Sequence, residues 1–172
     1  MSQVMIDLET LDTKPSSVVL SIGAVEFNPE TGEVFKETGY EMFPDIQEQL
    51  DAGRTISAST LLWWMGQGDE ARGAITKARR KSVKECLEHF RWWCQKGSRC
   101  KAWGNGSVFD ITMMEDLMDH TQIPWKFWDI RDTRTLWDIH PYDKNKKGET
   151  AHTALEDAIA QAERVCEVWP KK

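Results

Sequence analysis

Long apolar runs are missing from this sequence. Its longest uninterrupted apolar stretches, residues 18–20 and 22–25, are separated by one serine and fall far short of the roughly 20 residues that a membrane-spanning helix requires. The opening stretch, Met-Ser-Gln-Val-Met-Ile-Asp, has no basic flank and reaches an acid at once, unlike a secretory signal. We therefore expect no membrane span and a cytoplasmic location.

Paired cysteine motifs and an excess of positive charge are also absent. The four cysteines show no C-x-x-C spacing, so neither a zinc knuckle nor a disulfide framework is indicated, and we expect reduced, half-buried thiols. A net charge of -6 argues against a surface that coats nucleic acid, because such binding depends on Lys and Arg. It does not exclude a nuclease, whose acidic metal site is compensated by cations.

The composition is that of one globular unit. A chain of 172 residues with 40% hydrophobic and 29% charged residues can bury a core, and we interpret residues 1–172 as a single domain. Nine tryptophans make the core or a binding face unusually aromatic.

The hydrophobic patterns predict strands first and then helices alternating with strands. Such an order is typical of an α/β domain, in which a mixed sheet carries helices on its faces. A turn at residues 28–32 favours an antiparallel pair on either side of it. The predicted strands are 4–8, 17–27, 33–42, 99–105 and 126–130, the predicted helices are 57–66, 82–95, 107–120 and about 153–169, and residues 143–149 form a polar loop.

Asp7 and Glu9 form the first candidate site. They stand two residues apart on a predicted strand, so both carboxylates point to the same face. Like charges side by side are destabilising unless a proton or a cation offsets them. The pair therefore favours a divalent metal ion bound between the two carboxylates. The alternative is the solvated outer face of an edge strand.

Asp110 belongs to a second candidate element. A predicted strand passes through Asn105 and Gly106 into a helix, which places Asp110 in the first helical turn. The helix dipole favours a charged carboxylate there, as a metal ligand needs. An acid that only complements the dipole is the alternative.

His152 and Asp157 form the third element. Thr153 and Glu156 have capping-box spacing, which begins the last helix at Thr153 and leaves His152 in the preceding loop. Within one helix, side chains five residues apart diverge, whereas this arrangement lets His152 and Asp157 converge. The alternative is an ordinary loop histidine and an acid beside the apolar stripe.

Taken in order, Asp7-x-Glu9-Thr10, residues 105–110 and His152-x-Ala154-x-x-Asp157-Ala158 resemble the three motifs of the DEDDh 3'-5' exonucleases. That superfamily includes proofreading exonucleases, ribonuclease T and oligoribonuclease. Residues 5–25, the Trp63–Trp64 pair and residues 131–135 look most like its phage and bacterial branch, typified by a mycobacterial exoribonuclease-like member.

The resemblance implies a ribonuclease-H-like fold, a five-stranded sheet with three antiparallel and two parallel strands. It implies that Asp7, Glu9, Asp110 and Asp157 hold two Mg²⁺ or Mn²⁺ ions, that His152 is the general base, and that Glu9 also positions the terminal 3'-hydroxyl. Hard carboxylate ligands suit these ions, and an imidazole can take a proton near neutral pH. It further implies cleavage from the 3' end of single-stranded or overhanging DNA or RNA, in a bacterial cell or a phage-infected host. The oligomeric state stays open, with a homodimer as one alternative.

Further residues are candidates for substrate binding. Single-stranded nucleic acid is held by aromatic stacking and by basic groups along its backbone. Each candidate could instead be a core or solvated side chain, and for Trp64 a place in the core is the alternative. The candidates are Thr10, Leu11, Trp63, Trp64, Asn105, Phe109, Lys146 and Lys147.

Two other functions stay open at this stage. One is a catalytically idle module that binds nucleic acid on the same fold, although a degenerate module tends to lose one of the five motif residues. The other is a hydrolase of dinucleotides or other small phosphodiesters.

Overall fold

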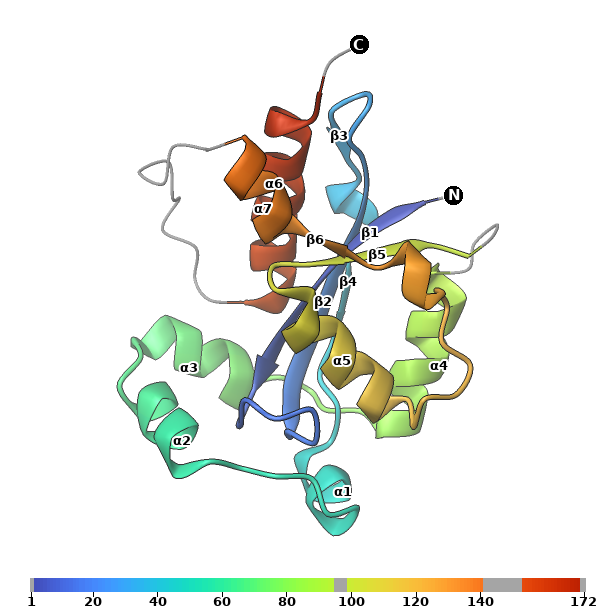
Figure 1. The fold of residues 1–172 in the computed structure, drawn as a ribbon. Coiled ribbons are helices and arrows are strands. Elements are labelled where there is room, and N and C mark those ends of the chain that lie inside the picture. Colours follow the sequence, from blue (N-terminus) through green and yellow to red (C-terminus); the bar gives the residue numbers. More distant parts are fainter. Residues whose placement is uncertain (1, 95–98, 141–152, 171–172) are drawn as a thin grey trace.

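A mixed sheet runs through the protein, which was analysed as a computed structural model that describes residues 2–94, 99–140 and 153–170 (Figure 1). The strands follow the order β3-β2-β1-β5-β6, and β4 also pairs with β2. On one side β1 is antiparallel to β2, and on the other it is parallel to β5. The strands are β1 (Gln3–Thr10), β2 (Val19–Asn28), β3 (Glu33–Val34), β4 (Tyr40–Met42), β5 (Lys101–Gly104) and β6 (Arg131–Asp132).

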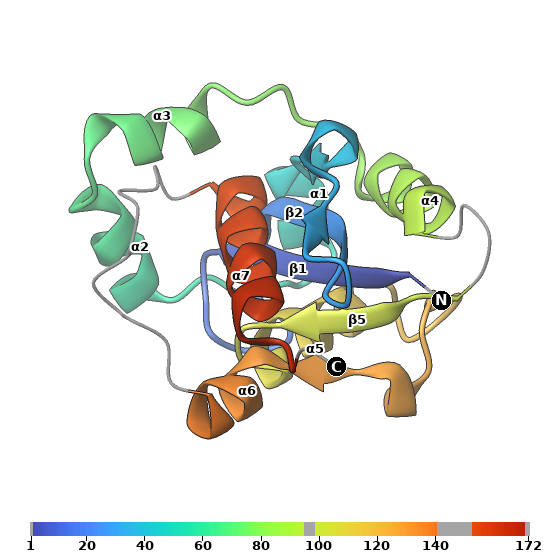
Figure 2. The ribbon, with the colours of Figure 1, turned by 90° about the horizontal axis from the view of Figure 1, so that it is seen from above.

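Helices cover both faces of the sheet (Figure 2). Helix α7 packs against β1 and β2, whereas α5 packs against β5 and β1 and α4 lies against β4. The prediction of an α/β domain with a mixed sheet is therefore confirmed. The helices are α1 (Ile46–Asp51), α2 (Ala58–Met65), α3 (Asp69–Thr76), α4 (Val83–Cys94), α5 (Ser107–Leu117), α6 (Thr133–Ile139) and α7 (Ala154–Val168), with short 3-10 turns η1 (Lys36–Thr38) and η2 (Phe127–Asp129).

Strand β1 has a purely apolar face and a mixed face. Val4, Ile6 and Leu8 belong to the core cluster that α4 and α5 complete. Met5, one residue out of phase with them, belongs to the cluster beneath α7. Because side chains alternate along a strand, the residues that follow Met5 on this second face are Asp7 and Glu9.

A glycine lets α7 lie directly on the sheet. Gly23 of β2 is the register partner of Asp7, and a methyl group at Gly23 would overlap the backbone of Ala154 and Leu155 at the start of α7. Small residues line the helix on the same side, since Ala154 and Ala158 are fully buried. The first turn of α7 therefore rests on the backbone of β2.

Two predicted strands differ from the structure. The 33–42 segment is divided into β3 and β4 by η1, where Lys36, Glu37 and Thr38 offer no apolar side chain to bury. The 126–130 segment forms η2 instead of a strand, because Phe127 and Trp128 are exposed and present no apolar face to the sheet. The last strand is β6, which begins only at Arg131.

Three further expectations can be compared with the described ranges. Thr153 is the N-cap of α7, and its side chain accepts a hydrogen bond from the backbone N–H of Glu156. The four cysteines carry free thiols, as expected, but three of them are fully buried and only Cys166 is half-buried. Among the helices of the described segments, none has the length and apolar character needed to cross a membrane.

We expect the Gly23→Ala variant to be less stable than the wild type by about 2 kcal/mol or more, because the added methyl group meets backbone atoms that cannot rotate away. Chemical denaturation measures this loss. Gly68→Ala is the matched control, since nothing lies within 4 Å of the position of its new methyl group. Equal stability of the two variants would show that α7 does not depend on the contact.

Candidate metal centre

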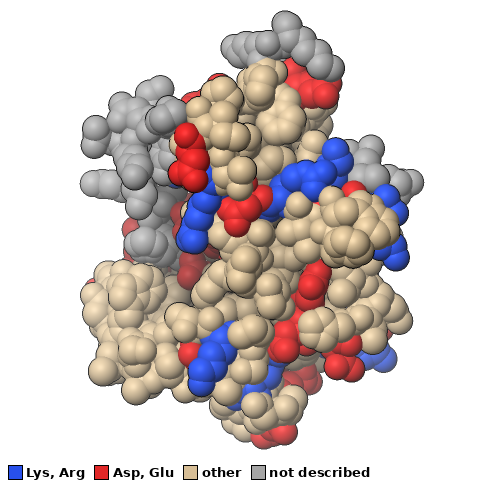
Figure 3. All heavy atoms as spheres, viewed as in Figure 1, with Lys and Arg blue, Asp and Glu red and all other residues tan. Residues whose placement is uncertain are grey.

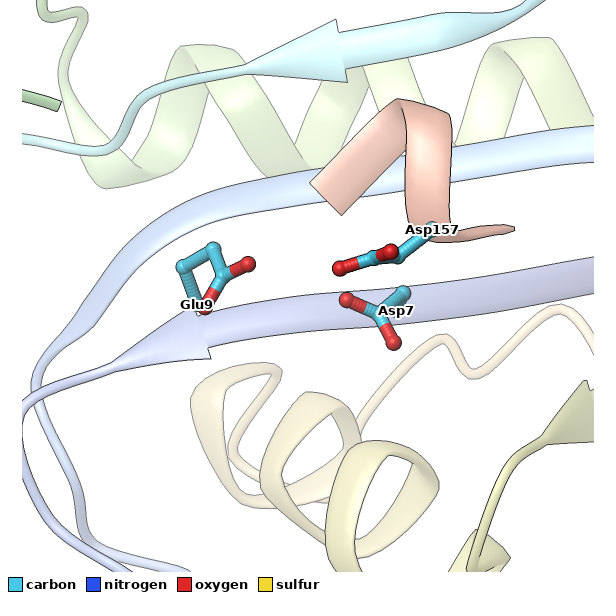
Figure 4. Close-up of side chains that lie close together, drawn as sticks. All are labelled: Asp7, Glu9 and Asp157. Atoms are coloured by element: carbon cyan, nitrogen blue, oxygen red, sulfur yellow. The ribbon is translucent and has the colours of Figure 1, made fainter. Parts of the chain in front are cut away.

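Three carboxylates meet between β1 and the first turn of α7 (Figure 4). Asp7, Glu9 and Asp157 each offer an oxygen, and these oxygens all lie within 4.8 Å of one another. All three residues are partly accessible to solvent. Asp157 of the third motif thus lies beside Asp7 and Glu9 of the first motif.

The local structure explains why the three side chains converge. Asp7 and Glu9 share the face of β1 that α7 covers, and Glu9 is next to last in the strand. Asp157 lies in the first turn of α7, whose position is set by the Thr153 cap and the contact with Gly23. An acid in the first turn of a helix is also favoured by the helix dipole.

Asp110 approaches the same site from the other side of β1. It lies in the first turn of α5, as predicted, and is only 4% exposed. Its Oδ1 accepts a hydrogen bond of 3.2 Å from the backbone N–H of Leu8. This N–H is available because β5 pairs with β1 only as far as Met5. Asp110 lies outside the group of three oxygens but is close enough to interact with it electrostatically.

Burial and nearby negative charges raise the pKa values of Asp7, Glu9 and Asp110. Burial raises the pKa of Asp7 well above its ordinary value, and the charges of Asp110 and Glu9 raise it further. The pKa of Glu9 is raised to about 8, chiefly by burial and then by Asp157 and Asp110. Burial also raises the pKa of Asp110 to about 7, although the backbone of Leu8 and the nearby Arg134 act in the opposite direction.

The donor set fits a divalent metal. Ionised carboxylates that lie this close repel one another, and a divalent cation among them would relieve the repulsion that raises the pKa values of Asp7 and Glu9. Hard oxygen ligands without a thiolate or imidazole are the ligands that Mg²⁺ and Mn²⁺ prefer. Asp7, Glu9 and Asp157 could hold such an ion, with Asp110 beside them.

Polar groups around the acids keep the elements in place. Nε2 of Gln161 donates a hydrogen bond of 2.8 Å to Oδ1 of Asp7. Asp132 accepts hydrogen bonds from the backbone N–H groups of Ser107 and Arg134, at 2.7 and 2.9 Å, and so caps the starts of both α5 and α6. The guanidinium of Arg134 lies against Gly106, where an added methyl group would come within 2.9 Å of it.

Of the aromatic candidates, Trp63 and Trp64 have opposite surroundings. Trp63 is 49% exposed, whereas Trp64 is 7% exposed and packs in a core cluster. Nε1 of Trp64 donates a hydrogen bond of 2.9 Å to the carbonyl of Thr10, the residue after Glu9. Trp64 is thus a core residue, which was the alternative to substrate binding. Its hydrogen bond attaches α2 to the end of β1.

The other candidate contacts are largely engaged within the fold. Thr10 and Leu11 are buried, and Phe109 packs partly buried against the main core. Oδ1 of Asn105 accepts a hydrogen bond of 2.8 Å from Thr133. Three further candidates, His152, Lys146 and Lys147, lie outside the described residues.

Sequence reasoning missed two residues that shape the site. Gln161 is a polar residue within the apolar stripe of α7, and a polar side chain at a predicted core position is a signal that it has a specific partner. Gly23 is an isolated glycine inside an apolar strand, which is a known sign of a close backbone approach. Both signals were present in the sequence.

The fold is the ribonuclease-H-like fold that the resemblance implied, and several solved nucleases share it. Solved structures with the same fold include exonuclease I with bound product (TM-score 0.62, 12% identity, covering 96% of this chain and 43% of that one). They also include the cell-death related nuclease 4, CRN-4 (TM-score 0.58, 11% identity, covering 98% of this chain and 64% of that one). A third is the nuclease domain of 3'hExo, a DEDDh family member bound to rAMP (TM-score 0.55, 16% identity, covering 97% of this chain and 90% of that one). The chain spans less than two thirds of the first two proteins.

The chain belongs to the family of the 3'-5' exoribonuclease Rv2179c-like domain, whose model matches residues 2–169. It is also similar to the exodeoxyribonuclease of Enterobacteria phage T4, with 27% identity over 160 residues that cover 78% of this chain and 70% of the phage protein. Both findings agree with the resemblance drawn from the three motifs.

We expect the metal-free protein to lose stability as the pH rises from 5.5 to 8.5. Glu9 and Asp110 have folded-state pKa values of about 8 and about 7, above the value of about 4 for unfolded carboxyls. The folded state then binds more protons, so each titrating group lowers the free energy of unfolding by up to about 1.4 kcal/mol per pH unit. Urea denaturation in the presence of a chelator measures the slope.

The control for this pH dependence is the double variant Glu9→Gln with Asp110→Asn, which should reduce the slope and leave the contribution of Asp7. Addition of Mn²⁺ to the wild type should flatten it as well, because a bound cation takes over the role of the protons. A wild-type stability that rises with pH over this range would contradict the expectation.

Proposed function

We propose that this protein is a metal-dependent 3'-5' exonuclease that releases nucleoside 5'-monophosphates from the 3' end of single-stranded or overhanging DNA or RNA. The observation that carries the proposal is the convergence of Asp7, Glu9 and Asp157 within 4.8 Å, with Asp110 at their side. These four acids come from the three motifs and occupy the ends of β1, α5 and α7. Membership of the exoribonuclease family supports the direction and the class of reaction.

Each of the acids has a role in this proposal. Asp7, Glu9, Asp110 and Asp157 hold two Mg²⁺ or Mn²⁺ ions, which when bound activate water and stabilise the charge that develops on the leaving oxygen. Glu9 also positions the terminal 3'-hydroxyl of the substrate. His152, which precedes α7, accepts the proton of the attacking water, as its ordinary pKa near 6.5 allows.

The charge distribution favours recognition of a strand end over coating of a long strand. The face shown in Figure 3 carries Lys and Arg side chains in separate groups, interleaved with Asp and Glu. Non-specific affinity for a phosphate backbone scales with the number of paired cations. Binding energy therefore comes from the metal centre, from stacking on Trp63 and from Lys146 and Lys147 in the segment before His152.

The first test is digestion of 5'-labelled single-stranded DNA and RNA with Mg²⁺, Mn²⁺ or a chelator. We expect a ladder that shortens from the 3' end with either metal and not with the chelator. Asp7→Ala and Asp157→Asn should reduce the rate by at least about 100-fold, because the first removes a ligand from the cluster and the second removes a negative charge. Intact strands in every lane of the wild type, with binding retained, would identify an idle binding module.

The second test addresses Trp63. Because stacking of a base on an aromatic ring contributes about 1–3 kcal/mol, Trp63→Ala should weaken binding of a short oligonucleotide at least about fivefold. Trp92→Ala is the matched control, since Trp92 is an exposed tryptophan on α4. Fluorescence anisotropy with Ca²⁺ in place of Mg²⁺ measures affinity, and an equal effect of the two variants would exclude a stacking role for Trp63.

A further inference from the structure

A buried glutamine stands behind the metal centre. Gln161 follows Asp157 by four residues on α7, so the two side chains lie one above the other on the same face of the helix. Its neighbours on the buried side of α7 are Ala158, Ala162 and Val165. Gln161 is 8% exposed, and Nε2 donates a hydrogen bond of 2.8 Å to Oδ1 of Asp7.

Packing alone does not explain a glutamine at this position. Within the described part of the chain, Oε1 of Gln161 is buried and has no hydrogen-bond partner. An unsatisfied buried acceptor is destabilising, whereas a methionine of similar volume would fill the same space without one. The hydrogen bond to Asp7 is the favourable interaction that the amide adds over an apolar side chain.

The donor is also neutral, which matters in this cluster. A lysine or arginine at position 161 could hold Asp7 as well, but its charge would cancel part of the negative charge that attracts a metal ion. The amide restricts rotation of the Asp7 carboxylate and leaves the charge of the cluster intact. Such outer-shell donors orient metal ligands in proteins.

We propose that Gln161 is a positioning residue of the metal centre, which fixes the orientation of the Asp7 carboxylate toward Glu9 and Asp157 before a cation binds. The inference rests on the proposed function, because it assigns Asp7 as a ligand. It adds a residue outside the three motifs to the machinery of the site.

The test is the affinity for Mn²⁺ alone, measured by isothermal titration calorimetry in the absence of nucleic acid. Gln161→Met keeps the volume and removes the donor, and we expect its Mn²⁺ dissociation constant to rise about 10- to 100-fold. Gln161→Asn keeps an amide that is one methylene too short to reach Asp7, and it should weaken Mn²⁺ binding similarly. Its Mn²⁺ affinity also tests the inference if the methionine variant does not fold.

Gln49→Met is the matched control for loss of a buried glutamine. Gln49 is 1% exposed, accepts a hydrogen bond from the backbone N–H of Val19 and donates one to the carbonyl of the same residue, at 2.8 and 2.9 Å. Its replacement should lower the melting temperature and leave the Mn²⁺ affinity of the folded protein unchanged. An equal loss of Mn²⁺ affinity in Gln49→Met and Gln161→Met would overturn the inference, because the effect would then be general destabilisation.

Two failures can be told apart. If the wild type degrades oligonucleotides and binds Mn²⁺, and folded Gln161→Met and Gln161→Asn bind it equally well, the inference is wrong and the proposed function stands. If the wild type itself binds no Mn²⁺, the proposed metal centre is wrong and the inference falls with it.

Discussion

The contact between α7 and the backbone of β2 at Gly23 is the constraint on which the site depends. A helix normally rests on a sheet through layers of side chains, but here its first turn touches the strand directly. This close approach places Asp157 beside Asp7, which faces Gly23 across the β1–β2 ladder. A larger residue at this one position in β2 would separate two acids that are distant from it in the sequence.

The same arrangement concentrates negative charge at a place that solvent reaches only in part. Burial raises the pKa values of Asp7, Glu9 and Asp110, and the charges of neighbouring acids raise the pKa values of Asp7 and Glu9 further. Stability and function therefore make opposite demands on these side chains. Burial and repulsion favour their protonated forms, whereas catalysis needs the ionised forms. A divalent cation bound among the acids would satisfy both demands.

Much of this could be predicted from the sequence, because the decisive signals were local. Alternation on a strand placed Asp7 and Glu9 on one face, and the spacing of Thr153 and Glu156 located the start of α7. The errors came from segments whose structure depends on distant partners. The hydrophobic pattern predicted a strand at 126–130, yet Phe127 and Trp128 pack against each other and stay exposed. The partnership of Gln161 with Asp7 spans 154 positions and could be suspected only from its polarity.

The separation of the acids along the chain has a consequence for folding. Local contacts form early, whereas contacts between distant segments must await closure of long loops. Asp7 and Glu9 take their places when β1 pairs with β2, its neighbour along the chain, but Asp157 arrives only when α7 docks across Gly23. The three oxygens can therefore meet only late in folding, and the appearance of tight metal binding in a refolding experiment would mark the docking of α7.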